Sequence, residues 1–151
     1  MNEDSQRMPA INGNTVVWRN YWPPTIKGYD LVAQQEYMIS PHIPDSDKEY
    51  TDVSGNIVVW GDHRRRNSGG NTVVDIYGYK LSTQTEFLIY QNSSFLDSRH
   101  PAINGTFVVW DVYAEGIIYS KNLLTEEILS VSTIEAEQTG PDTDPDISGD
   151  I

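Results

Sequence analysis

The sequence contains no cysteine, which excludes a disulfide framework and a thiolate metal site. It also has no window in which apolar residues recur at helical spacing for three turns, so we expect almost no helix. No apolar run approaches the roughly 20 residues of a membrane-spanning helix, and the opening MNEDSQRMPA lacks the basic start and apolar middle of a secretory signal. We therefore expect no membrane insertion and no signal peptide in this stretch.

Basic residues are scarce, with 10 Lys and Arg against 22 Asp and Glu, a formal net charge of -12 and a pI near 4.4. So acidic a chain repels the phosphate backbone, and nucleic acid is not an expected partner. The 11 glycines and 8 prolines indicate many turns between short elements, and β-branched and aromatic residues dominate the remaining stretches. An all-β domain is therefore predicted.

One eight-residue phrase occurs three times. It reads GNTVVWRN from Gly13, GNIVVWGD from Gly55 and GTFVVWDV from Gly105, and a fourth copy begins as PDISGDI at Pro145. The four corresponding glycines are 42, 50 and 44 residues apart, the last of them being Gly149. A period in the forties indicates repeated supersecondary units.

Each unit has the pattern of four short antiparallel strands. Asn-Gly or Ser-Gly supplies the positive φ of a two-residue hairpin, which joins a first strand of about four residues to the VVW strand. A loop of variable length follows, longest over residues 63–73, and two more strands come after it with a polar turn between them. Four antiparallel strands in about 40 to 50 residues make the unit of a β-propeller blade.

We therefore predict one partial-propeller domain over residues 1–151. Its blades span approximately 9–43, 51–92 and 101–133, and residues 141–151 form a linker and the first strand of a further blade. The pattern PAI-(N/S)-G-x-x-VVW-x-D with DIY-x-Y-x-L-S-T resembles the TolB-like propeller repeats of archaeal and bacterial surface proteins. This resemblance implies that the PAI strand lies innermost, that the fourth strand lies outermost, and that the protein is extracellular or at the cell surface.

Three blades are fewer than the four to eight of closed propellers. Each broad face of a blade is apolar because it packs on a neighbour, so an arc of three blades leaves two such faces to be covered. Two explanations stay open. Two copies associate head to tail into a six-bladed homodimer with two-fold symmetry, or the segment belongs to a longer chain whose other blades complete the ring.

Aromatic residues supply the first candidate binding residues. Three tryptophans hold the same place in every repeat, which favours packing between blades over a sugar-binding platform. These are Trp18, Trp60 and Trp110. Tyr21, Trp22 and Tyr113 interrupt the repeat pattern in loops, and non-repeating exposed aromatics are the better candidates for binding.

The only basic cluster in the sequence runs from His63 through Arg64 and Arg65 to Arg66. Such a cluster can grip a phosphate or an anionic polymer, and it is therefore a second candidate binding site. In so acidic a chain, however, nearby carboxylates and solvent are expected to balance these charges.

No metal or other cofactor is predicted. Asp142, Asp144 and Asp146 alternate as the first ligands of a calcium loop do, but Pro145 stiffens the middle and no bidentate glutamate closes the loop. An interblade linker is the preferred interpretation of this segment. The histidines share no metal-ligand spacing; they are His42, His63 and His100. Three further aspartates are expected to accept backbone N–H bonds at turns, namely Asp62, Asp75 and Asp111.

The sequence contains no Gly-x-Ser-x-Gly elbow and no glycine-rich phosphate loop. We therefore predict a non-catalytic scaffold that binds protein or glycan through loops at one end of the channel. A carbohydrate-active lyase or hydrolase is the first alternative, and it requires a set of polar side chains to converge in one pocket. That set is Tyr21, Asp62, His63, Arg64 and Arg65. A purely structural spacer with no ligand is the second alternative.

Overall fold

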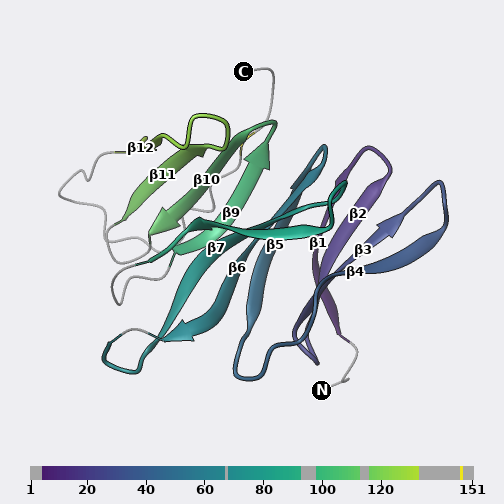
Figure 1. Ribbon diagram of the computed structural model, residues 1–151, viewed down its shortest axis with the longest axis horizontal. Helices are drawn as coiled ribbons and strands as arrows, with labels where there is room; N and C mark the ends of the chain where they lie inside the picture. Colours follow the sequence, from purple (N-terminus) through teal and green to yellow (C-terminus); the bar gives the residue numbers. More distant parts are fainter. Residues whose placement is uncertain (1–4, 67, 93–97, 113–115, 133–146, 148–151) are drawn as a thin grey trace.

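The computed structural model describes residues 5–66, 68–92, 98–112, 116–132 and 147. These residues form twelve strands and no helix, in three sheets of four antiparallel strands that follow one another along the chain (Figure 1). The part of the chain so described contains no helix long and apolar enough to cross a membrane. The predicted all-β class and the unit of four antiparallel strands are both confirmed.

Within each sheet the strands pair in chain order, so the first and fourth strands form the two edges. Blade 1 consists of β1 (Gln6–Asn12), β2 (Thr15–Asn20), β3 (Thr25–Asp30) and β4 (Gln35–Ser40). Blade 2 consists of β5 (Lys48–Ser54), β6 (Ile57–Arg66), β7 (Thr72–Lys80) and β8 (Thr85–Tyr90). Blade 3 consists of β9 (Ser98–Asn104), β10 (Phe107–Val112), β11 (Ile117–Asn122) and β12 (Ile128–Ser130).

The repeated glycines make the first turn of each blade. Gly13, Gly55 and Gly105 have φ of +56°, +54° and +57°. This is the left-handed region, which a residue with a Cβ enters at a cost of roughly 1 kcal/mol and glycine enters freely. Each two-residue hairpin turn consists of the glycine and the residue after it, because the residue before the glycine is the last of the first strand. Gly149 lies outside the described residues.

The first strand of each blade contains a bulge that the sequence analysis missed. Two residues, such as Met8 and Pro9, lie opposite one tryptophan, and the leading residue of each pair has a positive φ. These leading residues are Met8, Tyr50 and His100. Each first strand therefore has seven residues instead of the predicted length of about four, and His100 lies within β9. Proline fits here because a bulged position donates no ladder hydrogen bond.

The first strands of successive blades lie against one another. β1 contacts β5, and β5 contacts β9, while the fourth strands form the opposite edges of the sheets. A row of hydrogen bonds joins the inner turns, because Gly55 N donates to Asn12 Oδ1 at 2.9 Å and Gly105 N donates to Ser54 Oγ at 2.9 Å. This is the strand order that the resemblance to propeller repeats implies.

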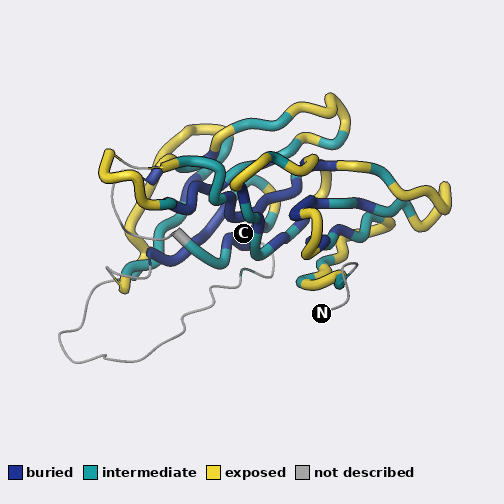
Figure 2. Tube along the Cα trace, turned by 90° about the horizontal axis from the view of Figure 1, so that it is seen from below, coloured by how far each residue is buried: buried dark blue, intermediate teal, exposed yellow. Residues whose placement is uncertain are grey.

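Two apolar clusters join the three sheets, and Figure 2 shows the buried backbone gathered between them. The cluster between blades 1 and 2 contains Val17, Ile26, Ile39, Val53, Val58 and Trp60. The cluster between blades 2 and 3 contains Val59, Ile76, Ile89, Ile103, Val108, Trp110 and Val112. Trp60 and Trp110 are completely buried, and each stacks on a tyrosine of its own third strand. The core therefore lies between blades, where Trp60 packs on the sheet of blade 1 and Trp110 on the sheet of blade 2.

The loop expected over residues 63–73 is shorter than predicted. β6 continues to Arg66 and β7 begins at Thr72, with Arg65 paired to Val73 across the two strands. A break in register between Asp62 and Arg65 separates this outer part of the hairpin from the sheet. Its arginines suggested a loop, yet charged residues are common where a strand extends beyond the core.

Candidate functional site

The connections that depart from the repeat pattern lie at one end of the blades. The β2–β3 loop (residues 21–24) and the β4–β5 connection (residues 41–47) follow strands that run to the same end, the lower side of Figure 1. The tight glycine turns lie at the opposite end. Irregular loops on a rigid sheet are the usual location of binding residues, so a site is expected at the end that carries them.

The two irregular connections of blade 1 enclose a groove of about 480 Å³. Its lining comes from the end of β2, the β2–β3 loop and the β4–β5 connection. The lining residues are Arg19, Tyr21, Trp22, Pro24, His42, Pro44, Asp45, Ser46 and Asp47. Tyr21 and Trp22 were candidates from the sequence, and the structure places both in this one groove.

Arg19 forms the floor of the groove and is almost completely buried. Its guanidinium donates to Asp47 Oδ1 at 2.6 Å and lies 4.0 Å from Glu49 Oε1. One carboxylate of the β4–β5 connection and one of β5 therefore hold Arg19 in place. Its Cζ also lies 5.2 Å from the centre of the Tyr21 ring, and the Cζ of Arg7 lies 5.1 Å from that ring. The Tyr21 ring is thus fixed by two cations.

Trp22 is the most exposed aromatic residue of the groove, with 58% of its surface accessible. Asn20 Nδ2 donates to the carbonyl oxygen of Trp22 at 3.1 Å, and the Trp22–Pro23 peptide bond is cis. The ring of His42 lies 6.3 Å from the Trp22 ring at an interplanar angle of 52°. A tethered loop therefore presents a large aromatic face beside an imidazole at the mouth of the groove.

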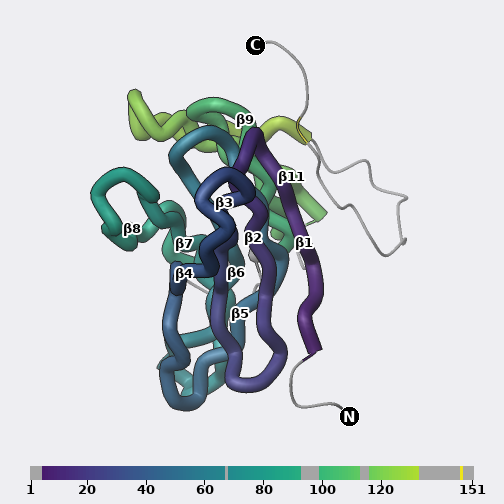
Figure 3. The backbone as a smooth tube through the Cα atoms, turned by 90° about the vertical axis from the view of Figure 1, so that its right-hand side faces the viewer, coloured from purple at the N-terminus to yellow at the C-terminus, as the bar shows by residue number. Residues whose placement is uncertain are grey.

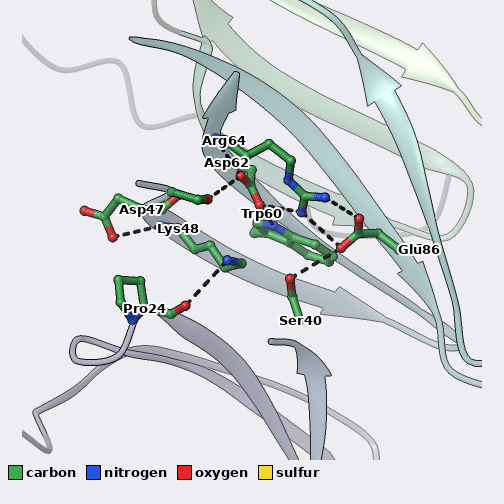
Figure 4. A network of polar contacts seen from close by, with 9 residues as sticks. Pro24, Ser40, Asp47, Lys48, Trp60, Asp62, Arg64 and Glu86 are labelled. Atoms are coloured by element: carbon green, nitrogen blue, oxygen red, sulfur yellow. Dashed lines mark hydrogen bonds and ion pairs between the residues drawn. The ribbon is translucent and has the colours of Figure 1, made fainter. Parts of the chain in front are cut away.

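Arg64, a candidate from the basic cluster, contacts the interior between blades 1 and 2 (Figure 4). It donates to Asp62 Oδ2 at 2.7 Å and to both carboxylate oxygens of Glu86, at 2.5 and 3.1 Å. Its Cζ lies 4.0 Å from the centre of the Tyr77 ring. Ser40 of blade 1 donates to the same Glu86 at 3.3 Å. Arg64 is therefore occupied by two carboxylates of its own blade, and Glu86 connects this ion pair to blade 1.

Asp62 is the centre of this network and is completely buried. Its Oδ1 accepts from Ser46 Oγ and from the backbone N of Arg64, both at 2.9 Å, and its Oδ2 accepts from Trp60 Nε1 at 3.0 Å. Burial raises the pKa of Asp62, but hydrogen bonds from Arg64 and Trp60, with the charges of Arg64 and Lys48, more than offset this effect. The net result is a pKa below the ordinary value, so the carboxylate is held ionised.

Lys48 is a buried charged residue that the sequence analysis did not single out. It is completely buried, and its Nζ donates to the carbonyl oxygen of Pro24 at 3.5 Å (Figure 4). Burial lowers the pKa of Lys48, and the charge of Asp62 opposes that shift. Since Pro24 belongs to the β2–β3 loop, Lys48 ties the groove to the network beneath it.

Arg65 and His63 point to different partners. Arg65 makes a two-pronged ion pair with the nearly buried Asp75, at 2.7 and 2.8 Å, and donates to the carbonyl oxygen of Asn92. His63 Nε2 lies 3.5 Å from Glu49 Oε2, and this contact lowers the pKa of Glu49. His63, Arg64 and Arg65 of the basic cluster are therefore each paired with carboxylates, while Arg66 donates to the Thr72 hydroxyl.

The other candidates fall in different places. His100 Nδ1 lies 2.8 Å from Asp111 Oδ1, whose pKa is raised by burial, and His42 lies in the groove. Asp62 and Asp75 each accept a backbone N–H bond, but both lie within strands, β6 and β7, and not at turns as predicted. Among the described residues, no three His, Cys, Asp or Glu side chains form a group that can hold a metal ion. Several candidates lie outside the described residues, namely Tyr113, Asp142, Asp144, Asp146 and Gly149.

The half of the groove that belongs to the β4–β5 connection was missed from the sequence. It is formed by PHIPDSD, residues 41–47, whose His42, Asp45 and Asp47 line the groove. The signal available was the clustering of proline, aspartate and serine, which marks an irregular connection. It identifies a loop, but it does not indicate that this loop faces Trp22.

No protein-family model matches the chain, and no curated protein matches it. Solved structures match it over most of its length. A chain from the crystal structure of a nidogen/laminin complex gives a TM-score of 0.63 at 12% identity, over 86% of this chain and 49% of that one. A protein described as a TolB from Agrobacterium tumefaciens gives 0.62 at 11% identity, over 86% and 50%. TolB from Acinetobacter baumannii gives 0.58 at 14% identity, over 83% and 32%.

The chain has the fold of β-propeller blades. The match to TolB structures agrees with the resemblance that the repeat pattern carries, and identities below 15% make this a likeness of fold alone. The chain spans half or less of the length of each of these three structures. Three blades of four strands are consistent with that share of a larger propeller.

Proposed function

We propose that this chain is a non-catalytic interaction scaffold that binds a neutral glycan in the groove of blade 1. The observation that carries this proposal is the exposed Trp22 ring, held by a tethered loop over a polar groove. The resemblance of the repeats to those of surface proteins supports an extracellular or cell-surface location, where glycans are available ligands.

The chemistry of the groove favours a sugar. An aromatic face packs against the apolar C–H side of a pyranose ring, while imidazole and carboxylate groups beside it can exchange hydrogen bonds with hydroxyls. His42 and Asp45 are exposed at the groove and supply such groups. Arg19 is already paired with Asp47, and the chain carries a net charge of -12, so an anionic ligand is disfavoured.

The alternative, a carbohydrate-active lyase or hydrolase, needs its polar side chains in one pocket. The geometry favours the scaffold, because Tyr21 lies in the groove of blade 1 while Arg64 and Arg65 are each paired with separate carboxylates of blade 2. His63 is not among the residues that line the groove; its backbone N donates to the carbonyl oxygen of Asp47 at 2.9 Å, and its imidazole lies beside Glu49.

Trp22→Ala tests the proposal. We expect an array of neutral oligosaccharides to show binding by the wild-type chain, and titration calorimetry with the tightest binder to show an affinity at least about tenfold lower for Trp22→Ala, a loss of ~1.4 kcal/mol. The physical reason is that the substitution removes the aromatic face against which the sugar packs.

The matched control is Val32→Ala, which truncates an exposed apolar residue in the β3–β4 turn at the opposite end of blade 1. It should bind as the wild type does, and Trp22→Phe should bind with an intermediate affinity. A blank array, or equal affinities of the wild type and Trp22→Ala, would contradict the proposed glycan site.

A further inference from the structure

Blade 1 presents an apolar face whose equivalents in the other two blades are covered. The clearest comparison is one position of the first strand, where Ile11 is 63% exposed while Val53 and Ile103 are each 4% exposed. Val53 belongs to the cluster shared with blade 1, and Ile103 to the cluster shared with blade 2. Figure 3 looks toward blade 1, and no other sheet lies in front of it. The same side-chain position is thus buried wherever a preceding blade is present.

Other residues of blade 1 extend this uncovered apolar face, which we call the leading face because it points away from blade 2. Leu31 is 46% exposed, whereas its equivalents Leu81 and Leu123 pack against the two interblade clusters. Trp18 is not fully buried, unlike the two tryptophans that follow it in the repeat. An open groove of about 480 Å³ lies on this face, and its lining is overwhelmingly apolar. The residues that form most of it are Val16, Trp18, Tyr29 and Leu31.

Blade 3 has the complementary surface on its other side, the trailing face. Val131 is 57% exposed, whereas its equivalents Ile39 and Ile89 are 4% and 3% exposed because the next blade covers them. Leu129 is also exposed, while its equivalents in blades 1 and 2 are partly buried against the interblade clusters. These equivalents are Tyr37 and Phe87. The trailing face of blade 3 is therefore built to receive a leading face.

We infer that the trailing face of one copy packs on the leading face of a second copy of this chain. The two joints inside the chain are made from the same pair of surfaces, so the proposed contact continues an interface that already occurs twice. Leaving both faces bare would expose apolar patches that drive association. A second copy supplies both faces at once, because its own blade 1 meets the blade 3 of the first.

The contact closes after two copies. In a propeller of six blades each blade turns by about 60°, so three blades span about half a circle and two chains complete it. A heterologous contact of this kind forms a ring when the rotation closes and a filament when it does not.

The test uses one charge on each face. Leu31→Lys places a cation on the leading face, and Leu129→Glu places an anion on the trailing face. Leu81 and Tyr37, the residues at the equivalent positions, belong to the same interblade cluster, so the two substituted side chains are expected to meet across the joint. Light scattering should give the wild type twice the 17.1 kDa of one chain. Each variant alone should give a single-chain mass, and an equimolar mixture should regain the doubled mass.

The mixture distinguishes a head-to-tail ring from a pair joined by identical faces, because only the ring brings the introduced lysine of one chain beside the introduced glutamate of the other. Leu88→Lys is the control, since Leu88 is an exposed residue of blade 2 and lies neither on the leading face of blade 1 nor on the trailing face of blade 3. This variant should keep the doubled mass. A wild-type mass of 17.1 kDa, an open oligomer, or a mixture that stays monomeric would each overturn the inference. If a variant fails to fold by circular dichroism, a wild-type mass of 17.1 kDa still overturns the inference.

Discussion

Trp60→Ala is expected to lower the free energy of unfolding by about 3–5 kcal/mol, the usual loss when a buried tryptophan is truncated. Trp60 is completely buried between blades 1 and 2, where it packs with Val17 and Ile39 and stacks on Tyr77 at a centroid distance of 6.3 Å. Its indole nitrogen also donates to Asp62 at 3.0 Å. The truncation therefore removes an apolar contact between blades and a donor to a buried carboxylate. Urea unfolding followed by circular dichroism measures the change.

Trp18→Ala is the matched control because Trp18 holds the same repeat position without a blade in front of it. Measured at a dilution at which the chain is monomeric, it should cost clearly less than Trp60→Ala. At concentrations that allow association, it should weaken the pairing of copies, since Trp18 lies on the leading face. Equal losses of stability in the dilute monomer would show that the tryptophans act within their own blades, contrary to the interblade role described above.

Asp62→Ala is expected to destabilise the fold by about 3–5 kcal/mol, as breaking a buried ion pair usually does. The substitution leaves Arg64 with Glu86 alone, and it removes the acceptor of Ser46 and of the Trp60 indole. Unpaired buried donors retain the cost of losing water. The free energy of unfolding in urea measures the loss. The control is Asp30→Ala at the end of β3, where Asp30 accepts two N–H bonds from the β3–β4 turn, with an expected loss of about 1 kcal/mol.

The same carboxylate predicts a dependence on pH. Because the folded pKa of Asp62 is lower than its unfolded value of about 3.9, its stabilising contribution is complete above that pH and is lost as pH falls through the folded pKa. Glu49, whose pKa is also lowered, acts in the same direction, whereas Asp111, whose pKa is raised, acts in the opposite one. Asp62→Ala should therefore lose part of the acid-induced decline in stability. An unchanged acid profile together with an unchanged stability would contradict the central role of Asp62.

Most of the architecture follows from the repeat itself. Glycines such as Gly55, spaced by 42 to 50 residues, mark hairpins, and the alternation after them places the second valine and the tryptophan of VVW on opposite faces of a strand. The bulges in the first strands were not predicted. A bulge shifts the pairing of two strands by one residue, and no residue type in these short strands marks where that shift occurs. The extension of β6 to Arg66 was missed for a different reason, since consecutive charged residues resemble a loop when their carboxylate partners come from distant strands.

The candidate site was predictable only in part. Trp22 stood out because it interrupts a pattern that the other repeats keep, and this reasoning needs nothing beyond the sequence. His42 and Asp47 could not be assigned to the same groove, because their approach to Trp22 depends on how the β4–β5 connection passes beside the β2–β3 loop. The buried Lys48 was also hidden, since a lysine in sequence is ordinarily read as exposed.

The central claim is that Trp60 and Trp110 each pack on the preceding blade. Its most direct test is a set of nuclear Overhauser contacts from the indole of Trp60 to methyl groups of blade 1. We expect cross-peaks to Val17, Ile26 or Ile39, and corresponding ones from Trp110 to Ile76 or Ile89 of blade 2. Indole contacts confined to residues of the same blade, with none to the blade before, would contradict the stacked arrangement of the three sheets.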